Sequence, residues 1–236
     1  KLSGDDQTKM DSFAIDGDVT FNMLVGEAAQ SFAFDLHLGA DVEFADIEKD
    51  SYNICPEKIE EKLKNDSSIK AIIPVHIAGN ICNMEKICAI AKKYEVYVIE
   101  DSAHAFPAKS KDGWAGTFGD VGVFSFYATK TITTAEGGMV VTSNEELAKR
   151  MTTMRLHGID RPVWDRYTSK KASWEYDVID AGFKFNMPDI LAAIGIEQLK
   201  KADIFLEQRK KIVEKYNKEF SKYDYFILPP DSDGNA

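Results

Sequence analysis

Apolar runs alternate with amphipathic segments through the middle of the chain. Three runs rich in isoleucine, valine and phenylalanine are typical of strands that are buried on both faces of a parallel sheet. Two further segments predict strands, one because polar and apolar positions alternate and one because it is short and rich in β-branched residues. The five predicted strands are 41–47, 70–76, 96–99, 121–126 and 139–142.

Helical patterns lie between and after these strands. Apolar residues at helical spacing, with capping residues at the ends, predict helices at 56–63, 84–94, 144–156, 188–199 and 204–223. In the helix at 188–199 we expect Ile190, Ala193, Ile194 and Ile196 to face a core. Residues 31–38 form a short amphipathic segment, and 225–228 could begin another strand.

The order of the elements indicates the fold class. Strand, helix and strand with short connections form a right-handed βαβ unit, so we expect an α/β fold with a mixed, mostly parallel sheet flanked by helices. Ligands of such sheets bind at the carboxyl ends of the strands. Residues 1–30 show no sustained period and receive no role, and 159–181 reads as a long, aromatic-rich loop.

Composition narrows the possible partners. The chain has 236 residues, 44% of them hydrophobic, and a formal net charge of -10 with no basic block, which argues against a nucleic-acid or anionic-membrane partner. No apolar run is long enough to span a membrane and the first residues lack the apolar core of a signal peptide, so a cytosolic location is the default. The spacing of the three cysteines indicates neither a disulfide frame nor a metal site.

Three chemically distinct groups fall at or near successive strand ends. Asp101 ends one predicted strand, Ser125 lies on the next, and Lys130 follows it before a loop that contains Gly137 and Gly138. A partly desolvated lysine at a strand end can attack a carbonyl carbon, although most such lysines are solvated. Asp101 could equally cap a turn, and Ser125 could be a small core residue. Together, however, an acid, a hydroxyl and a lysine meet the needs of pyridoxal phosphate (PLP).

At these residues the sequence resembles the DegT/DnrJ/EryC1/StrS-type PLP-dependent sugar aminotransferases, which have the aspartate aminotransferase fold (fold type I). The resemblance covers about 31–223, in the family's order and spacing. The matching segments are 46–54, 73–79, 99–105, 119–126, 129–130, 136–138, 157–158, 164–167 and 182–187. Several motifs together are far more specific than any one of them.

The resemblance implies a role for four residues around the cofactor. Lys130 would carry the internal aldimine and then move the proton between substrate and cofactor carbons. Asp101 would pair with the pyridinium nitrogen, and Ser125 would donate a hydrogen bond to the phosphate. His104 stands where the family places a residue near the cofactor's 3'-oxygen; a structural histidine is the alternative.

Two further residues are implied in a neighbouring subunit's site. Lys184 or Asn186 would reach the partner's cofactor phosphate, so the resemblance implies a homodimer with shared active sites. A capping or packing role is equally open for both residues. The glycines at 137 and 138 fit a tight turn, and His157 fits a structural role.

The resemblance further implies the reaction. An amino acid, with glutamate expected, would donate its amino group to a nucleotide-linked keto-sugar, with pyridoxamine phosphate as the intermediate form, in cytoplasmic polysaccharide biosynthesis. Retention of Lys130 argues against the family's dehydratase branch, which replaces that lysine. The alternative is a non-catalytic or regulatory relative, or an inactive fragment. A plain nucleotide-binding domain is disfavoured because no GxGxxG motif follows a strand.

The chain also departs from the family pattern. Residues 1–30 lack the Ser-Gly-Thr-Ala-rich turn whose amides would hold the cofactor phosphate, and the residue that stacks on the cofactor ring is missing. We therefore expect an unassigned segment at 1–30, a PLP-binding large domain at 31–200, and the start of a truncated C-terminal small domain at 201–236. The sequence reads as the central part of a longer enzyme.

Overall fold

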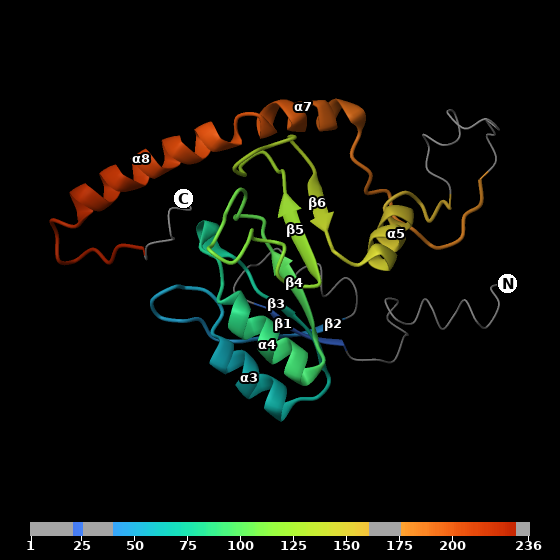
Figure 1. Cartoon of the computed structure of the whole chain (residues 1–236), viewed down its shortest axis with the longest axis horizontal. Helices are drawn as coiled ribbons and strands as arrows, with labels where there is room; N and C mark the ends of the chain where they lie inside the picture. The colour runs from blue at the N-terminus through green and yellow to red at the C-terminus, as the bar shows by residue number, and fades with distance from the viewer. Residues whose placement is uncertain (1–20, 26–39, 161–175, 230–236) are drawn as a thin grey trace.

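A six-stranded sheet forms the centre of the protein (Figure 1). The structure, a computed structural model, describes residues 21–25, 40–160 and 176–229. The sheet order is β2-β1-β3-β4-β5-β6, with β1 to β5 parallel and β6 antiparallel to β5. The strands are β1 (Phe21–Val25), β2 (Ala40–Phe44), β3 (Ile69–Ile73), β4 (Tyr97–Asp101), β5 (Val121–Ser125) and β6 (Gly138–Val141). The predicted mixed, mostly parallel sheet is confirmed.

Two strand assignments need correction. The segment 1–30, which received no role, contains β1, and β1 pairs with both β2 and β3 inside the sheet. The segment 225–228 contains no strand, because no neighbouring strand offers it hydrogen bonds. The amphipathic segment predicted at 31–38 lies outside the described residues.

The helices lie close to their predicted positions. They are α3 (Pro56–Asn65), the 3-10 turn η1 (Ile77–Gly79), α4 (Met84–Tyr94), α5 (Glu145–Met154), α7 (Asp189–Leu199) and α8 (Ala202–Phe220). Local chemistry fixes their starts: Pro56 opens α3, and the Asn83 and Asn144 side chains accept backbone N–H groups at the beginnings of α4 and α5.

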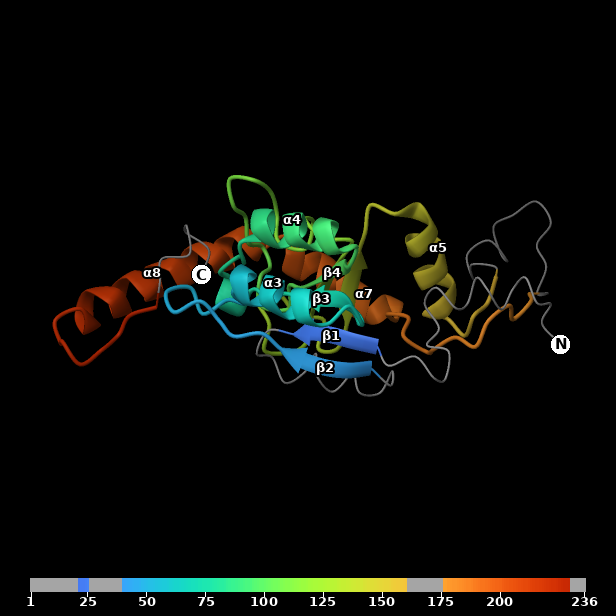
Figure 2. The ribbon, with the colours of Figure 1, turned by 90° about the horizontal axis from the view of Figure 1, so that it is seen from below.

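The main hydrophobic core lies between the sheet and the helix pair α3 and α4 (Figure 2). Ile59 from α3, Ile72 from β3 and Ile87 from α4 are completely buried in it. Burying such a side chain contributes about 1.5–3 kcal/mol relative to leaving it exposed. This packing supports one face of β3 and β4, the strands that lead to the predicted site.

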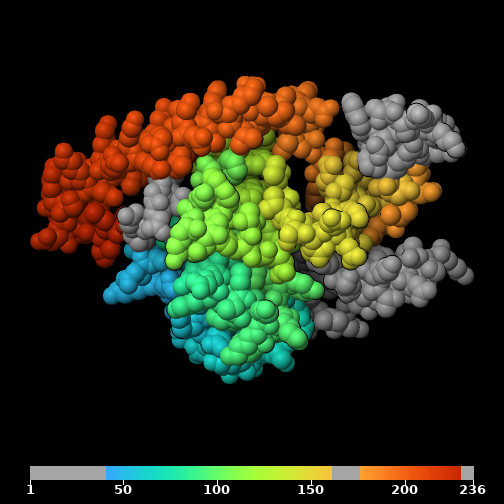
Figure 3. All heavy atoms as spheres, viewed as in Figure 1, coloured from blue at the N-terminus to red at the C-terminus, as the bar shows by residue number. Residues whose placement is uncertain are grey.

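The prediction that α7 faces a core is wrong for the described structure. Ile190 is 78% exposed and Ile196 is 59% exposed, and Ala193 and Ile194 are exposed as well. The helix is apolar on nearly all sides, so its sequence predicts that it packs against another surface but does not identify that surface. Figure 3 shows α7 on the molecular surface, where no described part of the chain covers its outer side.

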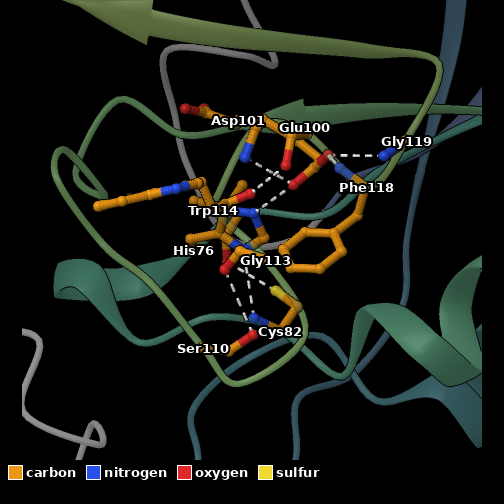
Figure 4. Close-up of polar contacts among 12 residues, drawn as sticks. His76, Cys82, Glu100, Asp101, Ser110, Gly113, Trp114, Phe118 and Gly119 are labelled. Atoms are coloured by element: carbon orange, nitrogen blue, oxygen red, sulfur yellow. Dashed lines mark hydrogen bonds and ion pairs between the residues drawn. The ribbon is translucent and has the colours of Figure 1, made fainter.

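A buried carboxylate joins the elements on this side of the sheet (Figure 4). Glu100 of β4 is fully buried, and one of its oxygens, Oε2, accepts hydrogen bonds from His76 Nε2 at 2.9 Å and from the backbone N–H of Gly116 at 2.8 Å. The other oxygen accepts the backbone N–H groups of Phe118 and Gly119, each at 2.6 Å. Glu100 thus ties β4 to His76, three residues after β3, and to the loop before β5.

The protonation of this pair follows from its partners. The backbone N–H of Cys82 donates to His76 Nδ1 at 3.1 Å, so Nδ1 carries no proton and Nε2 is the donor to Glu100. Burial raises the pKa of Glu100, but the hydrogen bonds from His76 and from the backbone at Gly119 outweigh it and leave this pKa below its ordinary value. Glu100 therefore stays ionised in the folded protein.

The Glu100 network also fixes the next residue of β4. Side chains alternate along a strand, so Glu100 and Val98 face α4 whereas Asp101 faces the other side of the sheet. The backbone of Asp101 accepts from His76 N–H at 3.1 Å and donates to the Pro74 carbonyl at 2.9 Å. These two bonds therefore hold the backbone of Asp101 against the segment 74–76 that follows β3.

We expect Glu100→Gln to destabilise the fold strongly. All four groups around the carboxylate are donors, so either orientation of an amide would place its NH₂ group against other donors. The expected loss is about 3 kcal/mol in the free energy of unfolding, measured by urea denaturation at neutral pH. Glu60→Gln, which removes a partly exposed carboxylate that pairs with Lys64 and Lys93, is the matched control and should change little.

The effect should depend on pH in one direction. The pKa of Glu100 is lower in the folded than in the unfolded state, so its stabilisation is complete above the unfolded value of about 4.3 and is lost as pH falls through the folded value. The stability gap between wild type and Glu100→Gln should therefore be constant near neutral pH and shrink in acid. A gap that grows in acid would contradict this role for Glu100.

Candidate functional site

The predicted site residues gather at the carboxyl ends of β4 and β5. These strands are parallel, and Asp101 pairs in register with Val123, so Ser125 lies two residues further along β5. Lys130 follows in the turn after β5, where its backbone N–H donates to the Tyr127 carbonyl at 3.0 Å. The carboxyl ends of parallel strands form the usual ligand side of such a sheet.

Asp101 and Ser125 each make a local hydrogen bond. Asp101 Oδ1 accepts the N–H of Ala103 at 3.0 Å, which is the turn-capping role considered above. Ser125 is half-buried and its Oγ accepts the N–H of Tyr127 at 3.3 Å. A hydroxyl that accepts can also donate, so Ser125 can still give its proton to an anionic group.

His104 lies close enough to Lys130 and Asp101 for both charges to change its pKa. Burial lowers the pKa of His104, the positive charge of Lys130 lowers it further, and the negative charge of Asp101 acts in the opposite direction. The imidazole is therefore neutral at neutral pH. The structure thus brings Asp101, His104 and Lys130 together.

Lys130 combines a fixed backbone with an uncommitted amine. Its side chain is half-buried and, within the described part of the chain, makes no hydrogen bond or ion pair. The loop around it, residues 126–137 (hereafter the lysine loop), is held by its own groups: Thr134 N–H and Thr133 Oγ1 both donate to the Phe126 carbonyl, at 2.9 and 3.1 Å. An amine held this way is free to react with a carbonyl carbon.

Lys184 and Asn186 lie in a separate segment. Lys184 donates to Asn186 Oδ1, and the segment pairs with the residues just after α5 through a bridge between Leu156 and Lys184. Asn186 lines a cavity of about 350 Å³ together with Glu136, Gly137, Gly138, Arg155, Phe185, Met187, Pro188 and Leu191. Neither Lys130 nor Asp101 lines this cavity. The action of Lys184 or Asn186 on a partner's cofactor site remains a prediction.

The buried pair of Glu100 and His76 was not recognised from the sequence as part of the support for the site. The available signal was an acid within an otherwise apolar strand and a histidine at the end of another. The family loop at 164–167 lies outside the described residues.

Other kinds of site find no support in the described residues. Across 21–25, 40–160 and 176–229, no group of His, Cys, Asp and Glu side chains is arranged to hold a metal ion. All three cysteines are free. No helix in the described ranges is both long and apolar enough to cross a membrane.

Comparison with known proteins relates this geometry to a family. The sequence pattern of the DegT/DnrJ/EryC1/StrS aminotransferase family matches residues 29–235. An uncharacterised protein of Methanocaldococcus jannaschii is 51% identical over 82% of this chain and 50% of its own length. UDP-4-amino-4,6-dideoxy-N-acetyl-beta-L-altrosamine transaminase of Campylobacter jejuni (serotype O:23/36) is 42% identical over 80% of this chain and 48% of its own.

A solved structure agrees with these relatives. The PLP form of the putative sugar aminotransferase Spr1654 from Streptococcus pneumoniae superposes with a TM-score of 0.77 and 27% identity, over 91% of this chain and 57% of that one. This chain spans about half the length of the curated relatives that it matches. Fold and sequence agree, and the chain belongs to the DegT/DnrJ/EryC1/StrS aminotransferase family.

Proposed function

We propose that this chain forms the cofactor-binding part of a PLP-dependent aminotransferase that transfers an amino group from an amino acid, glutamate in this proposal, to a nucleotide-linked keto-sugar. The observation that carries the proposal is the half-buried, uncommitted amine of Lys130 beside His104 and Asp101 at the carboxyl ends of β4 and β5. The names of the Campylobacter and Streptococcus relatives support the substrate class and the cofactor.

The residues present fit PLP. Lys130 offers a free amine for the cofactor's aldehyde, Asp101 a carboxylate for its ring nitrogen, and Ser125 a hydroxyl proton for its phosphate. His104 offers a neutral imidazole for the oxygen on the ring. When bound, PLP supplies an electron-poor ring that accepts the negative charge left on a carbon that loses a proton.

Each side chain then has a simple task. Asp101 keeps a proton on the ring nitrogen, because a carboxylate beside that nitrogen favours its charged form. Lys130 Nζ takes the proton from the substrate carbon and delivers it again as general base and acid. The lysine loop holds that nitrogen in place through its backbone, which limits the motion needed for proton transfer.

The proposed enzyme is a homodimer with shared sites. The outer side of α7 exposes isoleucines, and Phe185 beside it is 65% exposed. Apolar surface of this extent on a helix is typical of a protein contact. A second copy that covers α7 would approach the segment carrying Lys184 and Asn186, which is consistent with their action on the partner's cofactor.

The alternative is a relative that binds PLP without turnover. The two functions differ in the half-reaction with glutamate, which only an aminotransferase performs.

We expect Lys130→Ala in the full-length protein to abolish covalent capture of PLP. Borohydride should fix PLP to Lys130 of the wild type, identified by peptide mass spectrometry, and to no residue of the variant. The rate of the glutamate half-reaction should fall by at least about 10³-fold, because the proton carrier is lost. Lys111→Ala, an exposed lysine in the 109–119 connection, should behave as wild type.

The outcomes separate the hypotheses. An unchanged spectrum and half-reaction in Lys130→Ala would exclude the enzymatic role of Lys130. Capture of PLP by wild type without transamination of glutamate or any keto-sugar would favour the non-catalytic relative.

Asp101→Asn should reduce the half-reaction by about 10²-fold or more while leaving the fold intact. The amide oxygen can still accept the N–H of Ala103, so the turn is kept, but an amide does not hold the ring nitrogen protonated. Stopped-flow absorbance measures the rate, and thermal unfolding reports the fold. Asp112→Asn, in an exposed turn, is the control; a rate for Asp101→Asn equal to that control would contradict the assignment.

Replacing both Ile190 and Ile196 by Glu should dissociate the dimer. Each apolar side chain buried in a contact contributes about 1.5–3 kcal/mol, and in a two-fold contact each substitution acts twice. Light scattering after gel filtration at micromolar concentration should give the mass of one copy. Ala89→Glu, on an exposed position of α4, should leave the mass unchanged. An unaltered dimer in the α7 double variant would place the contact elsewhere.

A further inference from the structure

The first half of α8 packs against the lysine loop. Ala202 is buried and lies in one cluster with Phe124, Phe126 and Ile132, and Phe205 packs against the same cluster. Ile132 belongs to the lysine loop, two residues after Lys130. Residues 202, 205 and 209 lie on one side of the helix, because neighbours three and four positions apart share a face.

The third residue on this side of α8 is Arg209, and it reaches the loop with a charged group. Its Nη2 donates to the carbonyl of Thr131 at 2.9 Å, across 78 residues of sequence. Thr131 directly follows Lys130, so this bond holds the peptide group between Thr131 and Ile132, one residue beyond the lysine. A hydrogen bond from a charged donor is stronger than one between neutral groups.

The position of Arg209 has a cost in folding free energy. Its second terminal nitrogen, Nη1, is buried and finds no hydrogen-bond partner in the described ranges. Burial also lowers the pKa of the guanidinium from its ordinary value. A buried donor without a partner destabilises a fold, so stability alone does not account for an arginine at this position.

The contact matters because of what Lys130 lacks. The Lys130 side chain has no hydrogen bond of its own in the described structure. The position of the backbone at Lys130 therefore determines which region the amine can reach. On the N-terminal side the backbone is held by the Lys130 N–H bond to Tyr127. On the C-terminal side the Thr131 carbonyl is held by Arg209.

We propose that Arg209 is a positioning residue for Lys130: through the Thr131 carbonyl it fixes the backbone from which the lysine amine reaches the cofactor. This inference rests on the proposed function, in which Lys130 holds PLP and carries the proton. Arg209 itself touches neither the cofactor nor the substrate in this proposal.

The test compares Arg209→Met, which keeps a long side chain and removes the donors, with Arg209→Lys, which restores one donor. Lys211→Met, at an exposed position of the same helix, is the matched control. In the full-length holoenzyme, Arg209→Met should lower kcat by about 10-fold to 100-fold, the size of one charge-assisted hydrogen bond. The KM for the keto-sugar should stay unchanged, because the loss concerns proton transfer rather than sugar binding. Arg209→Lys should recover part of kcat, and Lys211→Met should equal wild type.

A second measurement needs no activity. Hydrogen exchange of the PLP-free protein, followed on peptides that cover 127–134, should be faster in Arg209→Met than in wild type, whereas peptides from α4 should exchange at equal rates. Faster exchange throughout the protein would show general unfolding instead. In that case the decision passes to Arg209→Lys, chosen because its thermal unfolding equals that of wild type. Its kcat and its exchange at 127–134 then report on the contact with Thr131.

The results distinguish the two levels of inference. If borohydride fixes no PLP to Lys130 in wild type, the proposed function fails, while faster exchange at 127–134 in Arg209→Met would still show that Arg209 holds the loop. If PLP is fixed to Lys130 but Arg209→Met matches Lys211→Met in kcat and in exchange at 127–134, the positioning role of Arg209 is overturned.

Discussion

The carboxylate of Glu100 is the constraint on which the site geometry depends. Burying a charge costs several kcal/mol, and the four hydrogen bonds around Glu100 offset that cost only when all of them are made. The end of β3, the end of β4 and the loop before β5 must therefore meet in one arrangement. Asp101 is the next residue of β4 and inherits that arrangement on the opposite side of the sheet. The network adds little net stability, but it determines where the carboxylate of Asp101, proposed to bind the cofactor, lies.

Lys130 presents the opposite case, because the role proposed for it requires an amine without partners. A side chain that must stay free cannot be positioned through its own hydrogen bonds, so the protein holds the surrounding backbone instead. Two helices contact the lysine loop and help to hold it. A Cβ at Gly195 of α7 would lie 2.9 Å from Thr134, which shows how closely that helix approaches the loop, and α8 contributes Arg209 and its apolar contacts.

The sequence predicts what local patterns encode and misses what depends on distant partners. Most strands and helices, and the placement of Asp101, Ser125 and Lys130 at strand ends, follow from short apolar runs and capping residues. The strand β1 has only five residues, and its pairing with β2 and β3 is what makes it a strand. The segment 225–228 has a similar apolar pattern but no neighbouring strand, so it is not one. Likewise, His76 and Glu100 are separated by 24 residues, and no local pattern predicts their hydrogen bond.

The exposed face of α7 connects assembly to cofactor binding. The lysine loop lies against one side of α7, through Gly195 and Thr134, and the proposed partner covers the other side. The segment with Lys184 and Asn186 leads directly into α7 through Pro188, so a partner that contacts the start of α7 would also lie near these two residues. If they complete the partner's cofactor site, then binding of PLP and association of two copies stabilise one another by mass action. The apparent PLP affinity of such a protein rises with protein concentration, because only the associated form has the complete site.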